Sequence, residues 1–147
     1  MNYNLKAITI LLRSFNSLAE VLKQDISNYD LNTTEFGVLE FIYHKGKQPI
    51  NNLCQRLLMA NSSMTYVVDQ LVKKGYVTRV ADTVDKRITN IELTKNGEEF
   101  ITTIFPNHEK RINEIFEVLT EEEVTTLMGL LKKVGYHSVS LVEKKSK

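Results

Sequence analysis

A helical pattern gives way to a strand pattern within residues 61–97, NSSMTYVVDQLVKKGYVTRVADTVDKRITNIELTKNG. Before Gly75, apolar side chains recur at the i, i+3, i+4, i+7, i+8 spacing of one buried helical face, at Met64, Val67, Val68, Leu71 and Val72. After Gly75, two short β-rich runs, YVTRV and ITNIEL, flank the polar segment 81–87. This order predicts a helix over residues 61–74 followed by a β-hairpin.

Two shorter helical segments come before this stretch. The sequence NTTE at residues 32–35 is typical of a capping box and predicts a helix that ends near Gly46. A second helix opens at Pro49 and ends in a brief turn at residues 59–60, which leads to Asn61 or a neighbour as the next N-cap. Its apolar residues are Leu53, Cys54, Leu57 and Leu58. Helices joined by a tight turn and followed by a hairpin predict a winged helix-turn-helix over residues 32–97.

The polar side of helix 61–74 has short side chains at its start and lysines at its end. A helix that reads DNA is apolar where it packs on its own domain and short-chained where it enters the major groove. The expected base-edge contacts are Ser62, Ser63, Thr65, Tyr66 and Gln70, and the expected phosphate contacts are Lys73 and Lys74. An ordinary amphipathic helix with a serine-rich start is the alternative for this helix considered alone.

Long amphipathic helices flank the predicted lobe. Residues 5–29 repeat apolar side chains in steps of three and four, which makes a heptad-like seam. Helices are also predicted over 96–119, with a kink at Pro106, and, after a second capping box, over 121–142. Because these helices carry more apolar surface than a small domain needs, we expect dimerisation helices in residues 1–31 and 98–142. An intramolecular helix bundle is the alternative.

Composition restricts the class of protein. The 147 residues are 42% apolar and 25% charged, which predicts one globular domain. The net charge is only +1, but residues 45–97 carry nine basic and four acidic side chains. That local excess favours a phosphate-binding surface, although an excess of this size also arises by chance. The single Cys54 excludes an internal disulfide, and the lack of a membrane-length apolar run or signal-peptide layout predicts a cytoplasmic protein.

Four landmarks in order give the chain a resemblance to the MarR (multiple-antibiotic-resistance regulator) family of bacterial transcription factors. LCQRLLMANSSMTYVVDQLVKKGYVTR is followed by DTVDKRITNIELTKNG, which resembles the family's wing signature D-x-x-D-x-R and its L-T-x-x-G ending. LNTTEFGVL and LTEEEVTTL resemble two further landmarks, and the likeness covers about residues 5–142. The resemblance implies a homodimeric repressor with interlocking terminal helices and two winged lobes on a palindromic DNA operator.

The resemblance also implies roles in the wing. Arg87 would enter the DNA minor groove with Asp85 bracing it, and Lys86 would contact a neighbouring phosphate. The alternative for this DKR tip is a solvated turn. The carboxylate of Asp69 would be repelled by phosphate unless it were paired, so we expect it to organise the wing with Arg79 or Arg87 as partner.

Members of that family commonly respond to small phenolic or other aromatic compounds bound between the dimer helices and the DNA-binding lobe. The resemblance therefore implies an aromatic effector, with Phe15, Tyr43 and His44 as the expected pocket residues. His108 falls on the apolar face of its helix and is expected to be a hydrogen-bonded structural histidine rather than a ligand contact. His44 and His137 are expected at the surface.

Other function classes have less support. The sequence has three scattered histidines, one cysteine and no glycine-rich phosphate loop. These residues make no catalytic or metal-ligating constellation, so we expect no enzyme activity, cofactor or metal. Oxidation sensing through Cys54 is one alternative, although a free cysteine mostly behaves as a small apolar side chain. A winged-helix module that binds protein is another. It would need neither Arg87 nor the serine-rich helix start, and its binding would lack the steep salt dependence of DNA binding.

Overall fold

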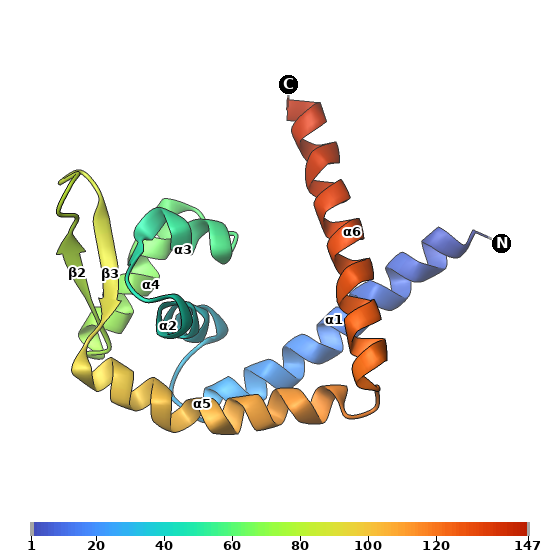
Figure 1. The fold of residues 1–147 in the computed structure, drawn as a ribbon, viewed down its shortest axis with the longest axis horizontal. Helices are drawn as coiled ribbons and strands as arrows, with labels where there is room; N and C mark the ends of the chain where they lie inside the picture. Colours follow the sequence, from blue (N-terminus) through green and yellow to red (C-terminus); the bar gives the residue numbers. More distant parts are fainter. Residues whose placement is uncertain (1, 147) are drawn as a thin grey trace. The chain divides into compact units, whose positions relative to one another are not determined.

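The computed structural model describes residues 2–146 and is mainly helical, with a small antiparallel sheet, as the sequence predicts (Figure 1). Its elements in chain order are α1 (Tyr3–Ser27), α2 (Thr33–Lys45), β1 (Gln48–Pro49), α3 (Ile50–Arg56), α4 (Asn61–Lys73), β2 (Val77–Ala81), β3 (Thr89–Leu93), α5 (Lys95–Phe116) and α6 (Glu121–Ser146). The chain forms two compact units, one ending at Lys110 and one starting at Arg111, so that α5 runs across the division. Within the described residues, no helix is both long and apolar enough to cross a membrane.

The sheet has the strand order β1-β3-β2 and is antiparallel throughout. The predicted hairpin is present, with β2 and β3 paired from Val77 opposite Leu93 to Ala81 opposite Thr89. The sequence did not predict β1, which pairs Gln48 with Ile91. Two residues are too few to show a strand period, and a proline in the second of them fits an edge strand because it has no N–H to donate.

The buried stripe of α4 attaches it to the first unit. Met64, Val67, Val68 and Leu71 are buried, but Val72 is 38% exposed, so its predicted place in the stripe is wrong. Val72 comes eight positions after Met64. At 100° per residue, this rotation puts Val72 at the edge of the stripe and not at its centre. The same core contains Phe36, Val38, Leu39 and Ile42 of α2, Leu53 of α3, Val77 of β2 and Ile91 of β3.

The turn between α3 and α4 is longer than predicted. Helix α3 ends at Arg56, and the Met59 N–H donates to the carbonyl of Cys54 (2.9 Å). Leu58, expected on the apolar face of a helix, instead has a left-handed φ of 52° and is 93% exposed. A leucine Cβ disfavours that conformation, which Leu58 holds between the core residues Leu53 and Met64.

Both predicted capping boxes are present. At the start of α2, Asn32 Oδ1 accepts from the Glu35 N–H (2.8 Å), and Glu35 Oε1 accepts from the Asn32 N–H (3.1 Å). The equivalent bonds before α6 join Thr120 and Glu123, at 3.1 and 3.0 Å. Each box satisfies two backbone N–H groups that have no partner within the helix.

The start of α5 lies against the chain entering β2. A Cβ on Gly97 would lie 1.9 Å from the carbonyl oxygen of Tyr76, so this position accepts only glycine. The Thr94 hydroxyl bonds the Gly75 carbonyl (2.5 Å) and accepts from the Gly97 N–H (3.0 Å). Further along, Pro106 lies inside α5, which is a continuous helix from Lys95 to Phe116.

A buried polar pair joins α1 to α5 within the first unit. His108 Nδ1 lies 3.0 Å from Asp25 Oδ2, and both side chains are under 10% exposed. The other ring nitrogen lies 4.0 Å from Glu40 on α2, and the imidazole packs on Phe36 with ring centroids 4.3 Å apart. His108 is therefore the hydrogen-bonded structural histidine that the sequence predicts, whereas His44 and His137 are exposed.

The second unit contains the end of α5 and all of α6. Apolar side chains of the two segments line an open groove of about 740 Å³, among them Ile112, Phe116, Val124, Leu127 and Met128. Much of α6 remains apolar and exposed, at Leu130, Leu131, Val134, Tyr136, Val139 and Leu141. Within its described residues, this unit thus leaves a long apolar face exposed.

Candidate DNA-binding interface

The outer face of α4 is polar and open. Ser62, Ser63, Thr65 and Tyr66 are exposed, with Tyr66 at 65%, while Gln70 is half-buried. The Thr65 hydroxyl donates to the carbonyl of Asn61 (2.9 Å), one turn earlier. Of the five side chains expected to contact base edges, Ser62 and Tyr66 lie opposite the stripe that packs on the core, and Ser63, Thr65 and Gln70 flank them.

The start of α4 has no side-chain cap among the described residues. Ala60 occupies the N-cap position, and the side-chain oxygen of Asn61 accepts from Cys54 Sγ (3.0 Å) instead of from a backbone N–H. The positive end of the helix dipole is therefore not neutralised by a capping side chain. Such a helix start attracts an anion such as a phosphate. Cys54 is half-buried and packs against the core.

The wing tip presents a braced cation. Arg87 Nε donates to Asp85 Oδ1, and Arg87 Nη2 donates to Asp85 Oδ2, with each donor 3.0 Å from its acceptor. The Arg87 side chain is nevertheless 92% exposed. These bonds hold the pKa of Asp85 below its usual range and raise the pKa of Arg87. The pairing fixes the direction of the guanidinium while leaving most of it open to solvent. Lys86 beside it is exposed.

Asp82 organises the wing loop, a role that the sequence reasoning did not assign. Its Oδ2 accepts from the N–H groups of Asp85 (2.9 Å) and Val84 (3.1 Å), and its Oδ1 accepts from the buried Asn90 side chain (2.9 Å). These bonds, led by that from Asp85, lower the pKa of Asp82. An aspartate that caps the backbone two and three residues ahead is a known turn signal, so the D-x-x-D spacing could have revealed it.

The partner of Asp69 is Arg79, on β2, and not Arg87. Arg79 Nη2 forms a short ion pair with Asp69 Oδ1 and also reaches the carbonyl of Thr65 (3.4 Å). The ion pair neutralises the carboxylate on the outer side of α4 and ties that helix to the first strand of the wing.

The two lysines at the end of α4 differ in their surroundings. Lys73 is exposed, as a phosphate contact requires. Lys74 Nζ lies 2.9 Å from Glu35 Oε2 and donates to the carbonyl of Asp30 (2.8 Å), inside the first unit. The Lys74 ammonium therefore already has two partners within the domain, whereas a contact of Lys74 with a flanking phosphate stays a prediction.

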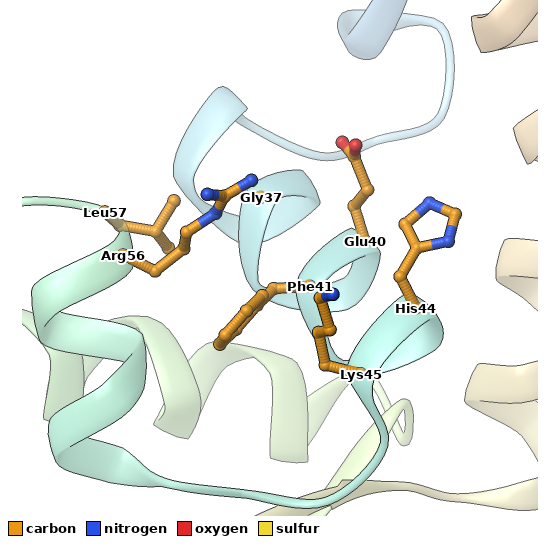
Figure 2. A pocket seen from close by; sticks show the side chains of 7 residues that line it. All are labelled: Gly37, Glu40, Phe41, His44, Lys45, Arg56 and Leu57. Atoms are coloured by element: carbon orange, nitrogen blue, oxygen red, sulfur yellow. The ribbon is translucent and has the colours of Figure 1, made fainter. Parts of the chain in front are cut away.

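A cavity of about 390 Å³ lies between α2 and the end of α3 (Figure 2). Its lining residues are Gly37, Glu40, Phe41, His44, Lys45, Arg56 and Leu57. The Arg56 guanidinium lies over the Phe41 ring, 5.7 Å from its centroid, so the cavity has an aromatic wall with a cation beside it.

Of the three expected pocket residues, His44 lines this cavity and the other two do not. Tyr43 and His44 instead form an aromatic group with Phe105, whose centroid lies 5.6 and 5.0 Å from theirs. Phe15 is 64% exposed on α1. The sequence reasoning missed Phe41 and Arg56, whose spacing of fifteen residues gives no local sign that one lies over the other.

Comparison with known proteins gives consistent matches. The MarR family model matches residues 31–89. The chain is 39% identical over 135 residues to the HTH-type transcriptional regulator MhqR of Bacillus subtilis, covering 92% of this chain and 93% of MhqR. It is 38% identical over 133 residues to YkoM, an uncharacterized HTH-type transcriptional regulator of the same organism, covering 90% of this chain and 86% of YkoM.

Solved structures agree with this match. A point mutant of MarR from E. coli, complexed with operator DNA, superposes with a TM-score of 0.77 at 28% identity, covering 89% of this chain and 95% of that one. AbsC from Streptomyces coelicolor shares the fold, with a TM-score of 0.87 at 19% identity over 95% of this chain and 97% of its own. With its winged helix-turn-helix, the chain belongs to the MarR family of DNA-binding transcriptional regulators.

Proposed function

We propose that this protein is a homodimeric repressor that binds a palindromic operator and is released by a small aromatic or phenolic ligand. One observation carries the proposal: the wing tip holds Arg87 in a fixed direction through Asp85 while leaving it 92% exposed. An arginine held in this way suits a narrow minor groove, where the negative potential is strongest. A merely solvated turn would not need two parallel hydrogen bonds to one side chain.

The outer face of α4 supports major-groove reading. Its hydroxyl and amide side chains can donate to or accept from base edges, and its uncapped start suits a phosphate. In this proposal, Ser62, Ser63, Thr65, Tyr66 and Gln70 read bases, and Lys73 and Lys86 contact phosphates. Asp69, Arg79 and Asp85 then hold these elements in place without touching DNA.

The apolar faces of the terminal helices support dimerisation. Within the first unit, α1 exposes Leu5, Ile8, Ile10, Leu12 and Phe15, all between 47% and 65%. In the second unit, α6 exposes its own apolar series and leaves the groove beside Phe116 open. Exposed apolar patches of this kind mark association sites, and a second copy of the chain offers the matching surfaces.

The cavity between α2 and α3 supports an effector site. Its volume of about 390 Å³ falls in the range of small-molecule sites, and Phe41 supplies a flat wall for an aromatic ring. Arg56 and Leu57 stand at the end of α3, directly before the turn that leads to α4. A ligand that moved this end of α3 would therefore act on the helix that reads DNA.

Selection from a random-sequence DNA library with purified protein tests the proposal. We expect enrichment of a palindrome, a steep fall in affinity with added salt, and a sedimentation coefficient of a dimer. Phenol and benzoate, added to the bound complex, should release the enriched duplex, whereas cyclohexanol of similar size should not. Binding to no duplex, together with capture of a protein partner, would replace the proposal by the protein-binding alternative.

A further inference from the structure

The end of α4 is fastened to the start of α2 by a partly buried ion pair, in which the Lys74 side chain is 30% exposed. Lys74 Nζ lies 2.9 Å from Glu35 Oε2, and the Glu35 side chain is only 6% exposed. The same ammonium donates to the carbonyl of Asp30 (2.8 Å), a residue held with a left-handed φ of 56° in the connection between α1 and α2. One side chain thus joins α4 both to the start of α2 and to the chain that enters it.

Glu35 has a second task that fixes its carboxylate. Its Oε1 accepts from the Asn32 N–H (3.1 Å) in the capping box, which leaves Oε2 to face Lys74. A buried carboxylate requires a partner, and for Glu35 that partner is Lys74. Lys74 therefore allows the Glu35 carboxylate to stay buried while it takes part in the capping box. The two side chains therefore depend on each other.

We infer that Glu35 and Lys74 are positioning residues for DNA recognition, and that Lys74 does not itself contact DNA. The inference rests on the proposed role of α4 as the helix that reads bases. It deepens that role by naming what sets the angle of the helix.

The geometry of α4 explains why its far end matters. The C-terminal end is closed by bonds from the Gly75 N–H to the Val72 carbonyl (2.9 Å) and from the Tyr76 N–H to the Leu71 carbonyl (3.0 Å). The N-terminal end, where the exposed serines lie, has no side-chain cap among the described residues and is tied to α3 by the hydrogen bond from Cys54 Sγ to Asn61 Oδ1 (3.0 Å). A helix of 13 residues is about 20 Å long, so a tilt of about 5° at the fastened end moves the other by ~2 Å. That displacement is enough to break a hydrogen bond to a base edge.

Salt dependence separates positioning from phosphate contact. A lysine on a phosphate releases counterions when it binds, so its removal lowers the slope of log affinity against log salt by about 1. A positioning lysine lowers the affinity while leaving that slope unchanged. Lys73, adjacent in sequence and exposed, supplies the matched control.

The experiment compares three variants of the full-length protein on the duplex that the wild type enriches from a random library. Glu35→Gln with Lys74→Met removes both charges, so that neither is left buried alone. Lys74→Gln removes only the ammonium and keeps an amide N–H donor for the Asp30 carbonyl or the Glu35 carboxylate. Lys73→Gln is the control, and circular dichroism and urea unfolding check that each variant folds.

We expect the double variant to lose about tenfold in affinity and Lys74→Gln about threefold, both with the wild-type salt slope, while Lys73→Gln lowers the slope. A folded Lys74 variant with wild-type affinity would overturn the inference, as would a slope that falls as it does for Lys73→Gln. Should the double variant not fold, Lys74→Gln alone decides between these outcomes. If the wild type enriches no duplex, the proposed function itself fails, which is a distinguishable result.

Discussion

Arg87 and Asp85 form a two-point pair at the tip of the wing, with Nε and Nη2 of the arginine each 3.0 Å from a carboxylate oxygen. The backbone N–H of Arg87 donates to the same carboxylate, and its nitrogen also lies 3.0 Å from the acceptor oxygen. Three bonds from one residue to another two positions earlier fold the tip onto itself. The guanidinium is thereby oriented before any DNA arrives, which reduces the entropy lost on binding.

Replacing Arg87 by alanine should weaken binding to the enriched duplex by about 1–3 kcal/mol without changing the fold or the oligomeric state. The reason is the loss of the oriented guanidinium from the minor groove. A gel-shift titration measures the effect, and Lys86→Ala is the control, because loss of a phosphate contact should weaken all sequences alike. Equal binding by the Arg87 variant and the wild type would contradict the minor-groove role.

Replacing Ser63 or Gln70 by alanine should relax the sequence preference, because base-edge contacts carry specificity. Each lost contact should reduce discrimination at one base pair by about 1–3 kcal/mol. Lys73→Ala should weaken all duplexes by a similar factor. Competition between the enriched duplex and single-base variants distinguishes the two effects, and the reverse pattern would mean that α4 lies in the groove in the opposite direction.

Replacing Gly97 by alanine should destabilise the fold by about 3 kcal/mol or more, because the new Cβ would meet a backbone carbonyl oxygen that cannot move aside. The midpoint of urea unfolding measures the change. Asn96→Ala, at the exposed position next to it, should change the free energy of unfolding by less than about 0.5 kcal/mol. Similar midpoints for the two variants would show that α5 can shift away from Tyr76.

The wing loop should lose its order in acid. Hydrogen bonds lower the pKa of Asp82 and of Asp85 below the ordinary 3.8, so their contribution to wing stability is present above pH 3.8. That contribution is lost as the pH falls through the lowered values. The amide signals of Val84 and Asp85 in NMR spectra should report this transition below pH 3.8, and Asp82→Asn should remove the part due to Asp82. A transition centred above the ordinary aspartate pKa would contradict the assignment.

Charges on the apolar face of α1 should separate the proposed dimer. Leu12 and Phe15 are 57% and 64% exposed within one chain, so Leu12→Glu with Phe15→Glu should leave the lobe folded. Sedimentation should then give a monomer, and DNA affinity should collapse, because each lobe would bind one half-site alone. Ser17→Glu, at an exposed polar position of α1, should remain dimeric. A double variant that stays dimeric would place the association elsewhere.

Local patterns in the sequence determined the helices and the β2–β3 hairpin and their order, but not the two-residue strand β1. The stripe of Met64, Val67 and Leu71 predicted α4, and the reciprocal side chains of Asn32 and Glu35 predicted where α2 begins. Each signal joins residues no more than one or two turns apart, whose relative positions are set by helix or strand geometry alone. The braced wing tip was expected from the family resemblance and not from a local pattern, although Asp85 and Arg87 are only two positions apart.

Only the tertiary structure decided which side chains meet across elements. Sequence alone left Asp69 with two possible partners and gave Lys74 a role on DNA, whereas packing paired them with Arg79 and Glu35. Packing also placed Val72 at the edge of its stripe and Leu58 in the solvent. These outcomes depend on how helices and strands are placed relative to one another, which the burial of the whole core decides and no local period encodes.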